Sequence, residues 1–355
     1  MKRMNKFSIG KISNLPATMW VGCFLGMAFP PSSSFAQDLH FSQFYRAPLL
    51  YNPASTGDMQ RAGRAIAMYK NQWTQVDNGY VSALFSADAQ LKPEWVKSNN
   101  IPAIGAMVHK DVGGDLKYGR VVGSILIADH LMMNSTQKLS FGIRAGVGKT
   151  AMELSGWQWG DQYDGNNYNS SLPGEVPFFQ PKTFIDFSAG TQYTWGENAA
   201  TMSSGDQQSL RIGLSAHHLS RPIENVAPGS TARQTIRYTA TAYGYLGQRN
   251  NSLAYLPSAY FSMQAGAREF VFGTNVLYRM KESSRYTNLV ESNGIGFGVF
   301  MRWGDSLIPS IFYDSEKFRL GISYDVNVAS YKQSTNGNGG FEVSFRYGIR
   351  SLSTE

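Results

Sequence analysis

The sequence predicts an all-β protein, a transmembrane antiparallel β-barrel of about fourteen strands. Only 16% of its 355 residues are charged, 13% are aromatic and 36 are glycine, whereas about a quarter of an ordinary soluble domain is charged. Beyond residue 36, no apolar run reaches the roughly eighteen residues of a membrane-spanning helix. Apolar and polar residues instead alternate along many segments, as strands between lipid and a lumen require.

Residues 1–36 are predicted to be a secretory signal peptide. An apolar stretch over 15–29 follows four basic residues, Lys2, Arg3, Lys6 and Lys11. Ser34 and Ala36 are the small residues that a signal peptidase reads, so we expect cleavage after Ala36. A lipoprotein signal with Cys23 as the lipidated residue is the rival interpretation, and the bulky Trp20 argues against it.

The mature chain is expected to carry little net charge and no cysteine. The whole chain has 32 Lys+Arg and 25 Asp+Glu. The signal removes four basic and no acidic residues, which leaves 28 against 25 and does not indicate a nucleic-acid partner. The one cysteine lies in the signal, so the sequence predicts no disulfide framework and no thiol chemistry.

Residues 37–63 are predicted to be an extended N-terminal lead-in or plug, ahead of a barrel over 64–350 and a tail over 351–355. Proline removes a backbone donor and pushes the preceding residue toward extended geometry, so we expect neither a helix nor a regular strand here. Because this stretch precedes the first strand, we expect it to start on the periplasmic side and to fill the lumen or meet a partner. The residues assigned to this role are Phe41, Phe44, Tyr45, Pro48, Tyr51, Asn52 and Pro53.

The alternation is clearest near the end of the chain. Even-numbered positions are apolar or aromatic from 318 to 328, and odd-numbered ones are from 341 to 349. A soluble sandwich also has one polar face, but long strands with aromatic residues near their ends favour a membrane barrel. The predicted strands are 64–73, 80–90, 102–111, 118–131, 138–150, 183–195, 209–219, 234–247, 253–265, 268–281, 292–303, 307–314, 317–329 and 339–350.

An even number of strands lets a closed barrel keep both termini in the periplasm. Connections after odd-numbered strands are then extracellular, among them the longest, 151–182, and also 220–233. In the longest connection, exposed aromatic residues among polar ones suit protein recognition. A loop folded over the barrel mouth is an equally good interpretation of the same stretch. The residues assigned to partner binding are Trp157, Trp159, Asp161, Tyr163, Asp164, Tyr168, Arg221 and Arg233.

Short motifs along the chain resemble those of one family. They lie at 40–45 (HFSQFY), 48–49, 52–54 and 69–73, and further on at 214–222, 237–238, 256–258, 320–326 and 341–347. Together they are similar to the PorP/SprF family of outer-membrane proteins in the type IX secretion and gliding apparatus. One departure is that 348–355 continue past Tyr347, whereas the family usually ends on an aromatic residue.

The resemblance implies a non-enzymatic protein of the cell outer membrane. It implies two kinds of protein partner: periplasmic secretion and motility components, and a secreted cell-surface protein retained through its type IX C-terminal domain. The lipid bilayer is a further partner, and neither nucleic acid nor a cofactor is expected. Two alternatives stay open: a passive or gated porin, and a barrel lipid hydrolase built from Ser215 or Ser220 with His217 or His218.

Three motifs are assigned no chemistry, and no metal site is predicted. Residues 146–150 imitate the end of a phosphate-binding loop, but Ile143 stands where the first glycine is required. His217 and His218 are strand neighbours, so we expect them to face opposite sides, one in the lumen and one near the extracellular end, and not to share a metal. The acidic stretch at 161–167 lacks the spacing of an EF-hand.

Charged residues at inward positions leave the nature of the lumen open. A lumen packed with opposite charges would be a pairing network that closes the barrel, whereas a wide one would be an aqueous channel. A fourteen-stranded barrel lies between filled small barrels and open porins. The residues expected to face the lumen are Arg144, Arg211, Arg302, Arg319, Arg346, Asp325 and Glu342.

Overall fold

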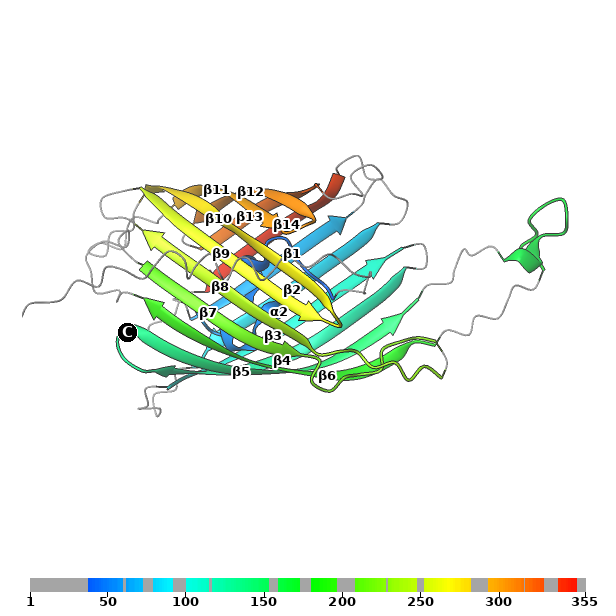
Figure 1. The fold of residues 1–355 in the computed structure, drawn as a ribbon, viewed down its shortest axis with the longest axis horizontal. Coiled ribbons are helices and arrows are strands. Elements are labelled where there is room, and N and C mark those ends of the chain that lie inside the picture. Colours follow the sequence, from blue (N-terminus) through cyan, green and yellow to red (C-terminus); the bar gives the residue numbers. More distant parts are fainter. Residues whose placement is uncertain are drawn as a thin grey trace, which may run out of the picture. The chain divides into compact units, whose positions relative to one another are not determined.

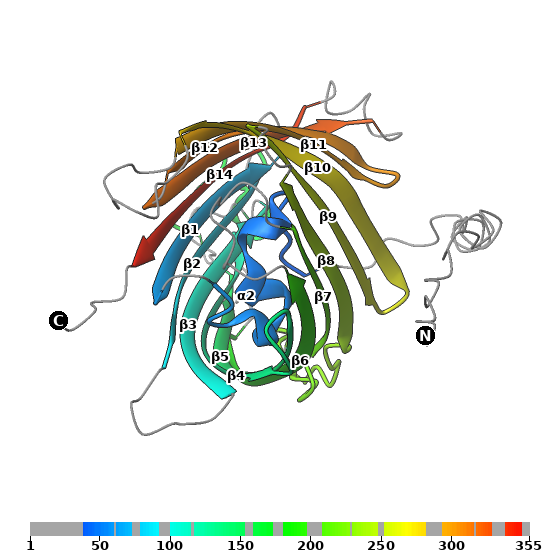
Figure 2. The same cartoon turned by 90° about the vertical axis from the view of Figure 1, so that its left-hand side faces the viewer.

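The computed structural model describes residues 38–59, 62–72, 79–91, 100–114, 117–152, 159–172, 180–196, 208–227, 229–247, 252–281, 293–315, 317–328 and 338–349. The predicted signal peptide with its cleavage site, the predicted tail at 351–355 and Trp157 lie outside these ranges. The described residues form a β-barrel with a short helical segment inside it (Figures 1 and 2).

The wall of the barrel has fourteen strands within the described ranges. They are β1 (Gly63–Gln72), β2 (Tyr80–Gln90), β3 (Asn100–Gly113), β4 (Tyr118–Met132), β5 (Gln137–Ala151), β6 (Lys182–Gly196), β7 (Gln208–His217), β8 (Arg237–Gly247), β9 (Leu253–Gln264), β10 (Ala267–Lys281), β11 (Asn293–Arg302), β12 (Ser306–Ser315), β13 (Phe318–Asn327) and β14 (Asn338–Ile349). The largest departure from the predicted bounds is at β8, predicted from residue 234. There the N–H of Gln234 bonds the carbonyl of Pro222 in the preceding connection, and pairing with β7 begins only at Arg237.

Every strand pairs antiparallel with its neighbours in the sequence, and β1 pairs with β14 to close the barrel. The closing ladder runs from Gly63 opposite Ile349 to Gln72 opposite Gly340. Closure leaves no sheet edge, so the backbone groups of the wall find partners within the wall. The predicted fold, an antiparallel barrel of fourteen strands, is confirmed.

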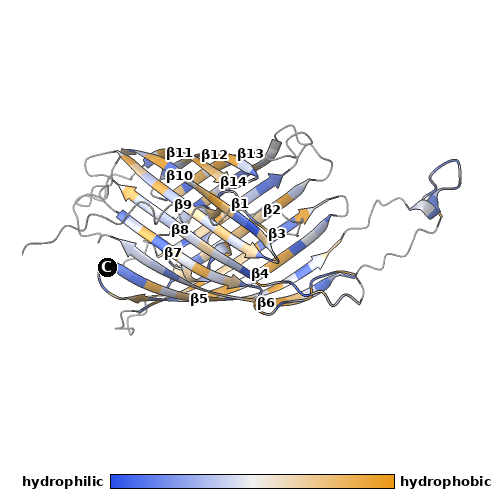
Figure 3. Cartoon of the chain, in the orientation of Figure 1, coloured by the Kyte–Doolittle hydropathy of each residue, from blue (hydrophilic) through white to orange (hydrophobic). Residues whose placement is uncertain are grey.

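Side chains of the wall alternate between the outer surface and the lumen. On the outer surface, Phe297 is 63% exposed and Ile143 is 61% exposed, whereas the inward Lys70 is 1% exposed. Figure 3 shows apolar and polar positions alternating along the strands. Apolar surface in water costs about 25 cal/mol per Å², so an outer face of this kind suits contact with lipid.

The lead-in folds as short helical turns, and our expectation of an extended segment is wrong. The turns are η1 (Phe44–Arg46), α2 (Pro48–Tyr51) and η2 (Pro53–Ser55). Pro48 and Pro53 each stand at the first position of a turn, where the missing N–H costs nothing and the fixed φ suits the helix. Asn52 caps η2 by accepting the N–H of Ala54 at 2.9 Å.

No helix among the described residues is long and apolar enough to cross a membrane.

The lead-in runs along the lumen from one end of the barrel to the other. We call the rim where residues 152–181 join β5 to β6 the long-loop end, and the opposite rim, where 133–136 join β4 to β5, the short-turn end. Asp38 contacts Arg120 near the start of β4, at the long-loop end. Asp58 contacts Lys138 near the start of β5, at the short-turn end, from which β1 then begins. The lead-in therefore starts at the end opposite to the start of β1, and our expectation that both start on the same side is wrong.

Candidate functional site

An aromatic cluster holds the middle of the luminal segment, which we define as residues 38–59. Phe44 is fully buried, and its ring lies 5.6 Å from that of Tyr260 and 5.9 Å from that of Phe300. Tyr45 stacks on Phe300 at 4.8 Å, and the ring of Tyr51 lies 4.7 Å from that of Tyr260. Ring pairs of this kind add about 0.5–1.5 kcal/mol each beyond the burial of their area. Side chains therefore fill the lumen at this level.

Glu342 on β14 holds the backbone of the segment. Its carboxylate accepts the N–H of Ser42 at 2.7 Å and that of Gln43 at 2.9 Å. The hydroxyl of Ser42 donates to Asp325 on β13 at 2.7 Å, and the hydroxyl of Ser344 donates to the side chain of Gln43 at 2.8 Å. Residues of the motif at 40–45 thus contact residues of the motifs in the last two strands.

A buried ionic network surrounds Ser42. Arg302 Nη2 lies 3.2 Å from the carboxylate of Asp325, and Arg302 Nε lies 3.3 Å from that of Glu269. Lys70 Nζ lies 3.6 Å from Asp325. Burial of a charge is costly unless an opposite charge and hydrogen bonds compensate it. The network meets this condition by pairing two cations with the same carboxylate.

Three of the four remaining inward charges extend this pairing along the wall. Arg346 is half-buried and pairs in register with the inward Ile66. Ion pairs hold three others: Arg144 with Asp186 at 3.3 Å, Arg319 with Asp314, and Arg211 with Asp58 at 3.6 Å. The described lumen is thus a pairing network built around an internal segment, which is the first of the two alternatives that the sequence left open.

Three glycines of the wall make room for the turn at 52–54. They are Gly142 on β5, Gly190 on β6 and Gly213 on β7. A Cβ on Gly142 would overlap the backbone of Pro53 and Ala54. A Cβ on Gly190 or Gly213 would overlap the side chain of Asn52. The turn therefore rests directly on the backbone of the wall.

Gly142→Ala is expected to destabilise the protein by about 1–3 kcal/mol, the usual cost of overpacking, because backbone atoms of Pro53 and Ala54 cannot swing aside. Thermal unfolding in detergent, followed by circular dichroism, measures the effect. Gly123→Ala on β4 is the matched control, because nothing lies within 4 Å of its Cβ position. Equal midpoints for the two variants would show that the turn does not rest on Gly142.

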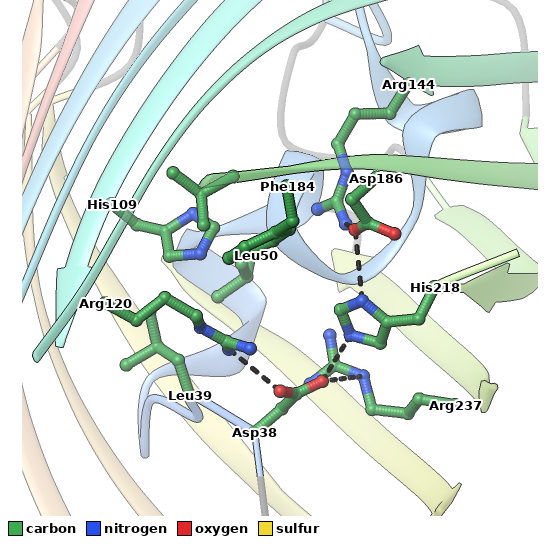
Figure 4. A pocket seen from close by; sticks show the side chains of 11 residues that line it. Asp38, Leu39, Leu50, His109, Arg120, Arg144, Phe184, Asp186, His218 and Arg237 are labelled. Carbon is green, nitrogen blue, oxygen red and sulfur yellow. Dashed lines mark hydrogen bonds and ion pairs between the residues drawn. The ribbon is translucent and has the colours of Figure 1, made fainter. Parts of the chain in front are cut away.

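Asp38 lies among cationic and amide groups at the long-loop end, and Figure 4 shows Arg120, His218 and Arg237 around it. Its Oδ1 accepts from Arg120 Nη2 at 2.8 Å and from Gln234 Nε2 at 3.0 Å. Its Oδ2 lies 2.5 Å from His218 Nε2 and 3.7 Å from Arg237 Nε. One carboxylate of the luminal segment therefore joins β4, β8 and the connection between β7 and β8.

His218 bridges two carboxylates. Its Nδ1 lies 3.0 Å from Asp186 on β6, and its Nε2 faces Asp38. Burial acts to lower the pKa of His218, but Asp38 and Asp186 outweigh it and raise the pKa above its ordinary value. Burial acts to raise the pKa of Asp38, but Arg120, His218 and Arg237 hold it well below its usual range. Asp38 is therefore an ionised partner of these cations.

Asp58 holds the luminal segment at the short-turn end. It pairs with Lys138, accepts from Gln192 Nε2 at 2.5 Å and lies 3.6 Å from Arg211. Burial acts to raise the pKa of Asp58, but the charges of Arg211 and Lys138 outweigh it and lower the pKa far below its usual range. The segment is thus tethered by one ionised carboxylate near each end.

His217 and His218 both lie inside the barrel, so the expectation that they face opposite sides is wrong. His218 has a φ of +60°, which ends the strand alternation after His217. Ser215 Oγ lies 3.1 Å from His217 Nε2, but it also lies 2.6 Å from the carbonyl of Tyr51. His217 Nδ1 has no hydrogen-bond partner in the described part of the chain. A serine hydrolase needs a group that orients its histidine, and Ser215 with His217 lacks one here.

The described part of the longest connection, 159–172, folds as a small unit. It contains η3 (Gly160–Gln162) and a β-bridge between Tyr163 and Tyr168, whose side chains are 57% and 40% exposed. Asp164 Oδ1 accepts the N–H of Asn166 at 2.9 Å and that of Asn167 at 2.8 Å, so it closes a turn. Five residues assigned to partner binding lie in this unit: Trp159, Asp161, Tyr163, Asp164 and Tyr168.

Arg221 and Arg233 lie in the connection between β7 and β8, residues 218–236. Both are exposed, and Arg233 Nη1 donates to the carbonyl of Arg221 at 3.2 Å. The two long connections meet where the N–H of Gln180 bonds the carbonyl of Val226 at 3.1 Å. The structure therefore brings Arg221 and Arg233 together beside the end of the longest connection.

The site around Asp38 was not predicted from the sequence. Arg120, Asp186 and Arg237 each occupy an inward position near the long-loop end of a strand, so the alternation carried a signal for them. Asp38 carried no such signal, because it lies outside the strands.

Comparison with known proteins gives a family for this chain. The family described as "Type IX secretion system membrane protein PorP/SprF" matches residues 33–347. Among curated protein sequences, none matches. Among solved structures, the chain is similar to BamA from Haemophilus ducreyi lacking POTRA domains 1-3, with a TM-score of 0.39 and 9% identity over 82% of this chain and 70% of that one. It is also similar to CdiB from Escherichia coli, with a TM-score of 0.40 and 8% identity over 81% of this chain and 63% of that one. The family match covers most of the sequence and both halves of the barrel, and the chain therefore belongs to the PorP/SprF family of type IX secretion system membrane proteins.

Proposed function

We propose that this chain is a non-enzymatic docking barrel of the type IX secretion and gliding apparatus in the outer membrane. Its long-loop end engages a secreted cell-surface protein through that protein's C-terminal domain, and its short-turn end engages periplasmic motor components. The luminal segment carries the proposal. Because Asp38 and Asp58 tether it near the two ends and an aromatic cluster fills the middle, the barrel suits an anchor better than a porin.

The lengths of the connections support the proposed orientation. Outer-membrane barrels have short periplasmic turns and longer extracellular loops. The two longest connections, 152–181 and 218–236, both join strands at the long-loop end, whereas the longest at the other end, 197–207 and 282–292, have 11 residues each. The long-loop end is therefore the one that we assign to the cell surface.

The 159–172 unit is the candidate contact for the secreted protein. Interfaces are enriched in aromatic residues, which bury much area with few rotatable bonds. Tyr163 and Tyr168 present exposed rings on a backbone that the Asp164 turn and the β-bridge hold in shape. A preformed loop of this kind loses little conformational freedom when a partner binds.

Replacing residues 159–172 by a Gly/Ser linker is expected to weaken capture of the secreted protein's C-terminal domain by about 30-fold or more, the effect of losing one interface hot spot. A pull-down with the purified barrel, titrated with the domain, measures this. The double variant Asn134→Ala/Thr136→Ala in the turn at the other end is the control and should capture normally. Undiminished capture after the loop replacement would remove this unit from the docking site.

A further inference from the structure

The groups around Asp38 form a receptor that its carboxylate does not fill. We define the Asp38 receptor as the side chains that contact this carboxylate: Arg120, His218, Gln234, Arg237 and Gln264. Two small cavities flank Asp38, and Arg237 lines both. The first is also lined by Arg144 and His109, which Figure 4 shows around the same space.

Donor groups remain unused in this space. Arg237 Nε and Arg144 Nη1 are buried donors with no hydrogen-bond partner in the described ranges, and His109 Nδ1, a donor or an acceptor according to the tautomer, is buried without a partner as well. Their residues are only 4%, 3% and 5% exposed. A buried donor without an acceptor costs free energy. The site can therefore donate hydrogen bonds to more acceptor atoms than the side chain of Asp38 supplies.

The receptor belongs to the wall and the outer connections, whereas its occupant belongs to the luminal segment. Arg120, Arg237 and Gln264 lie near the long-loop ends of three different strands. His218 reaches the site because its backbone adopts a φ of +60°, which costs free energy in a residue other than glycine. The imidazole of His218 thus points at the carboxylate of Asp38 from a strained backbone conformation, which indicates that the site is built to bind a carboxylate.

The charges at the site favour exchange of Asp38 over its simple loss. Without Asp38, Arg120 would still lie 3.1 Å from Glu224, and His218 would still lie 3.0 Å from Asp186. Arg237 would lose its ion pair with Asp38 and remain as a buried cation, which is strongly destabilising. A second carboxylate that replaced the first would avoid this cost.

We propose that the Asp38 receptor is a peptide-carboxylate site, that Asp38 is its intramolecular occupant, and that the terminal carboxylate of the docked secreted protein takes the place of Asp38. The inference rests on the proposed docking function and names the group that the long-loop end recognises. A chain end suits the site better than an internal acidic residue, because the receptor lies inside the wall and an end brings less chain with it. Docking at the surface would thereby release the start of the luminal segment.

Asp38→Ala empties the receptor for a direct test. The purified variant is titrated with acetyl-Gly-Gly-Leu bearing a free carboxyl terminus, with the same peptide amidated, with acetyl-Gly-Asp-Gly amide, and with chloride at equal ionic strength. The thermal unfolding midpoint reports binding. We expect the free acid to raise the midpoint and to bind about 10- to 100-fold more tightly than the amide, as loss of charged hydrogen bonds implies. The added substitution Arg237→Gln should abolish this difference.

Each other outcome overturns the proposal in a defined way. Equal action by chloride would make the site a general anion site, and preferential action by the aspartyl peptide would refute recognition of a chain end. If neither carboxylate peptide acts, Asp38 is a structural ion pair only. Should Asp38→Ala fail to fold, Asp38→Asn keeps the side-chain shape but removes its charge, and the same titration then measures displacement of the asparagine amide by the carboxylate. None of these measurements needs the secreted protein, so they succeed or fail separately from the capture experiment.

Discussion

Deletion of residues 38–58, with residue 37 joined to Met59, is expected to convert a closed barrel into an ion-conducting channel in planar lipid bilayers. The barrel should still form, because the ladder closes between β1 and β14 and β1 begins only at Gly63. The deletion removes Phe44, Tyr45 and Tyr51 from the centre of the lumen. Inward charges such as Arg302 and Asp325 would then face water, as in a porin.

Single-channel recording of the deleted and intact chains tests this expectation. A variant in which 38–58 are replaced by a Gly/Ser stretch of equal length separates the presence of any chain from the specific packing of this one, and we expect it to conduct. If the deleted chain stays closed, some other part of the protein blocks the lumen. If the intact chain already shows stable conductance, the porin alternative is the better description and the docking proposal loses its main support.

Asp325→Asn is expected to destabilise the protein by about 3–5 kcal/mol, the cost of breaking a buried ion pair. Asp325 is 1% exposed and serves both Arg302, at 3.2 Å, and Lys70, at 3.6 Å. Its carboxylate also accepts the hydroxyl of Ser42 at 2.7 Å. Neutralising it leaves two buried cations with less compensation and loosens the luminal segment. Denaturant unfolding in detergent gives the change in the free energy of unfolding.

Asp305→Asn is the matched control for this experiment. Asp305 pairs with the same arginine, Arg302, at 2.7 Å, but 26% of its side chain is exposed at the rim. A pair that water reaches contributes about 1 kcal/mol or less. The two substitutions make the same chemical change on two partners of Arg302. Similar losses in the free energy of unfolding would therefore contradict the idea that burial makes the Asp325 ion pair the more stabilising one.

The strands could be predicted because alternation is a local property. From Phe318 to Val328, each residue had to face either lipid or lumen, and a shift by one position would reverse every side chain. The inward charges followed from the same rule, which is why Arg302 and Glu342 lie where the sequence suggested. The rule stopped where the backbone left the strand, as at His218, whose φ of +60° no pattern of polarity encodes.

The helical turns of the lead-in show a different limit. Proline is a breaker inside a helix and a favourable first residue of one, so Pro48 and Pro53 allowed both interpretations. The turns form where Gly142, Gly190 and Gly213 leave space on the wall and where Glu342 accepts two backbone N–H groups. These supports come from strands remote in sequence, so the lead-in alone could not reveal them.

The sequence by itself determined the wall of this protein: its strands, their two faces, their closure and its family. Only the tertiary structure decided what fills the wall, in which direction the lead-in crosses it, and that Asp38 meets Arg120, His218 and Arg237. The physical reason is the range of the interactions. Neighbouring residues impose the alternation within each strand, whereas Ser42 meets Glu342 across 300 positions of sequence, which only closure of the barrel brings together.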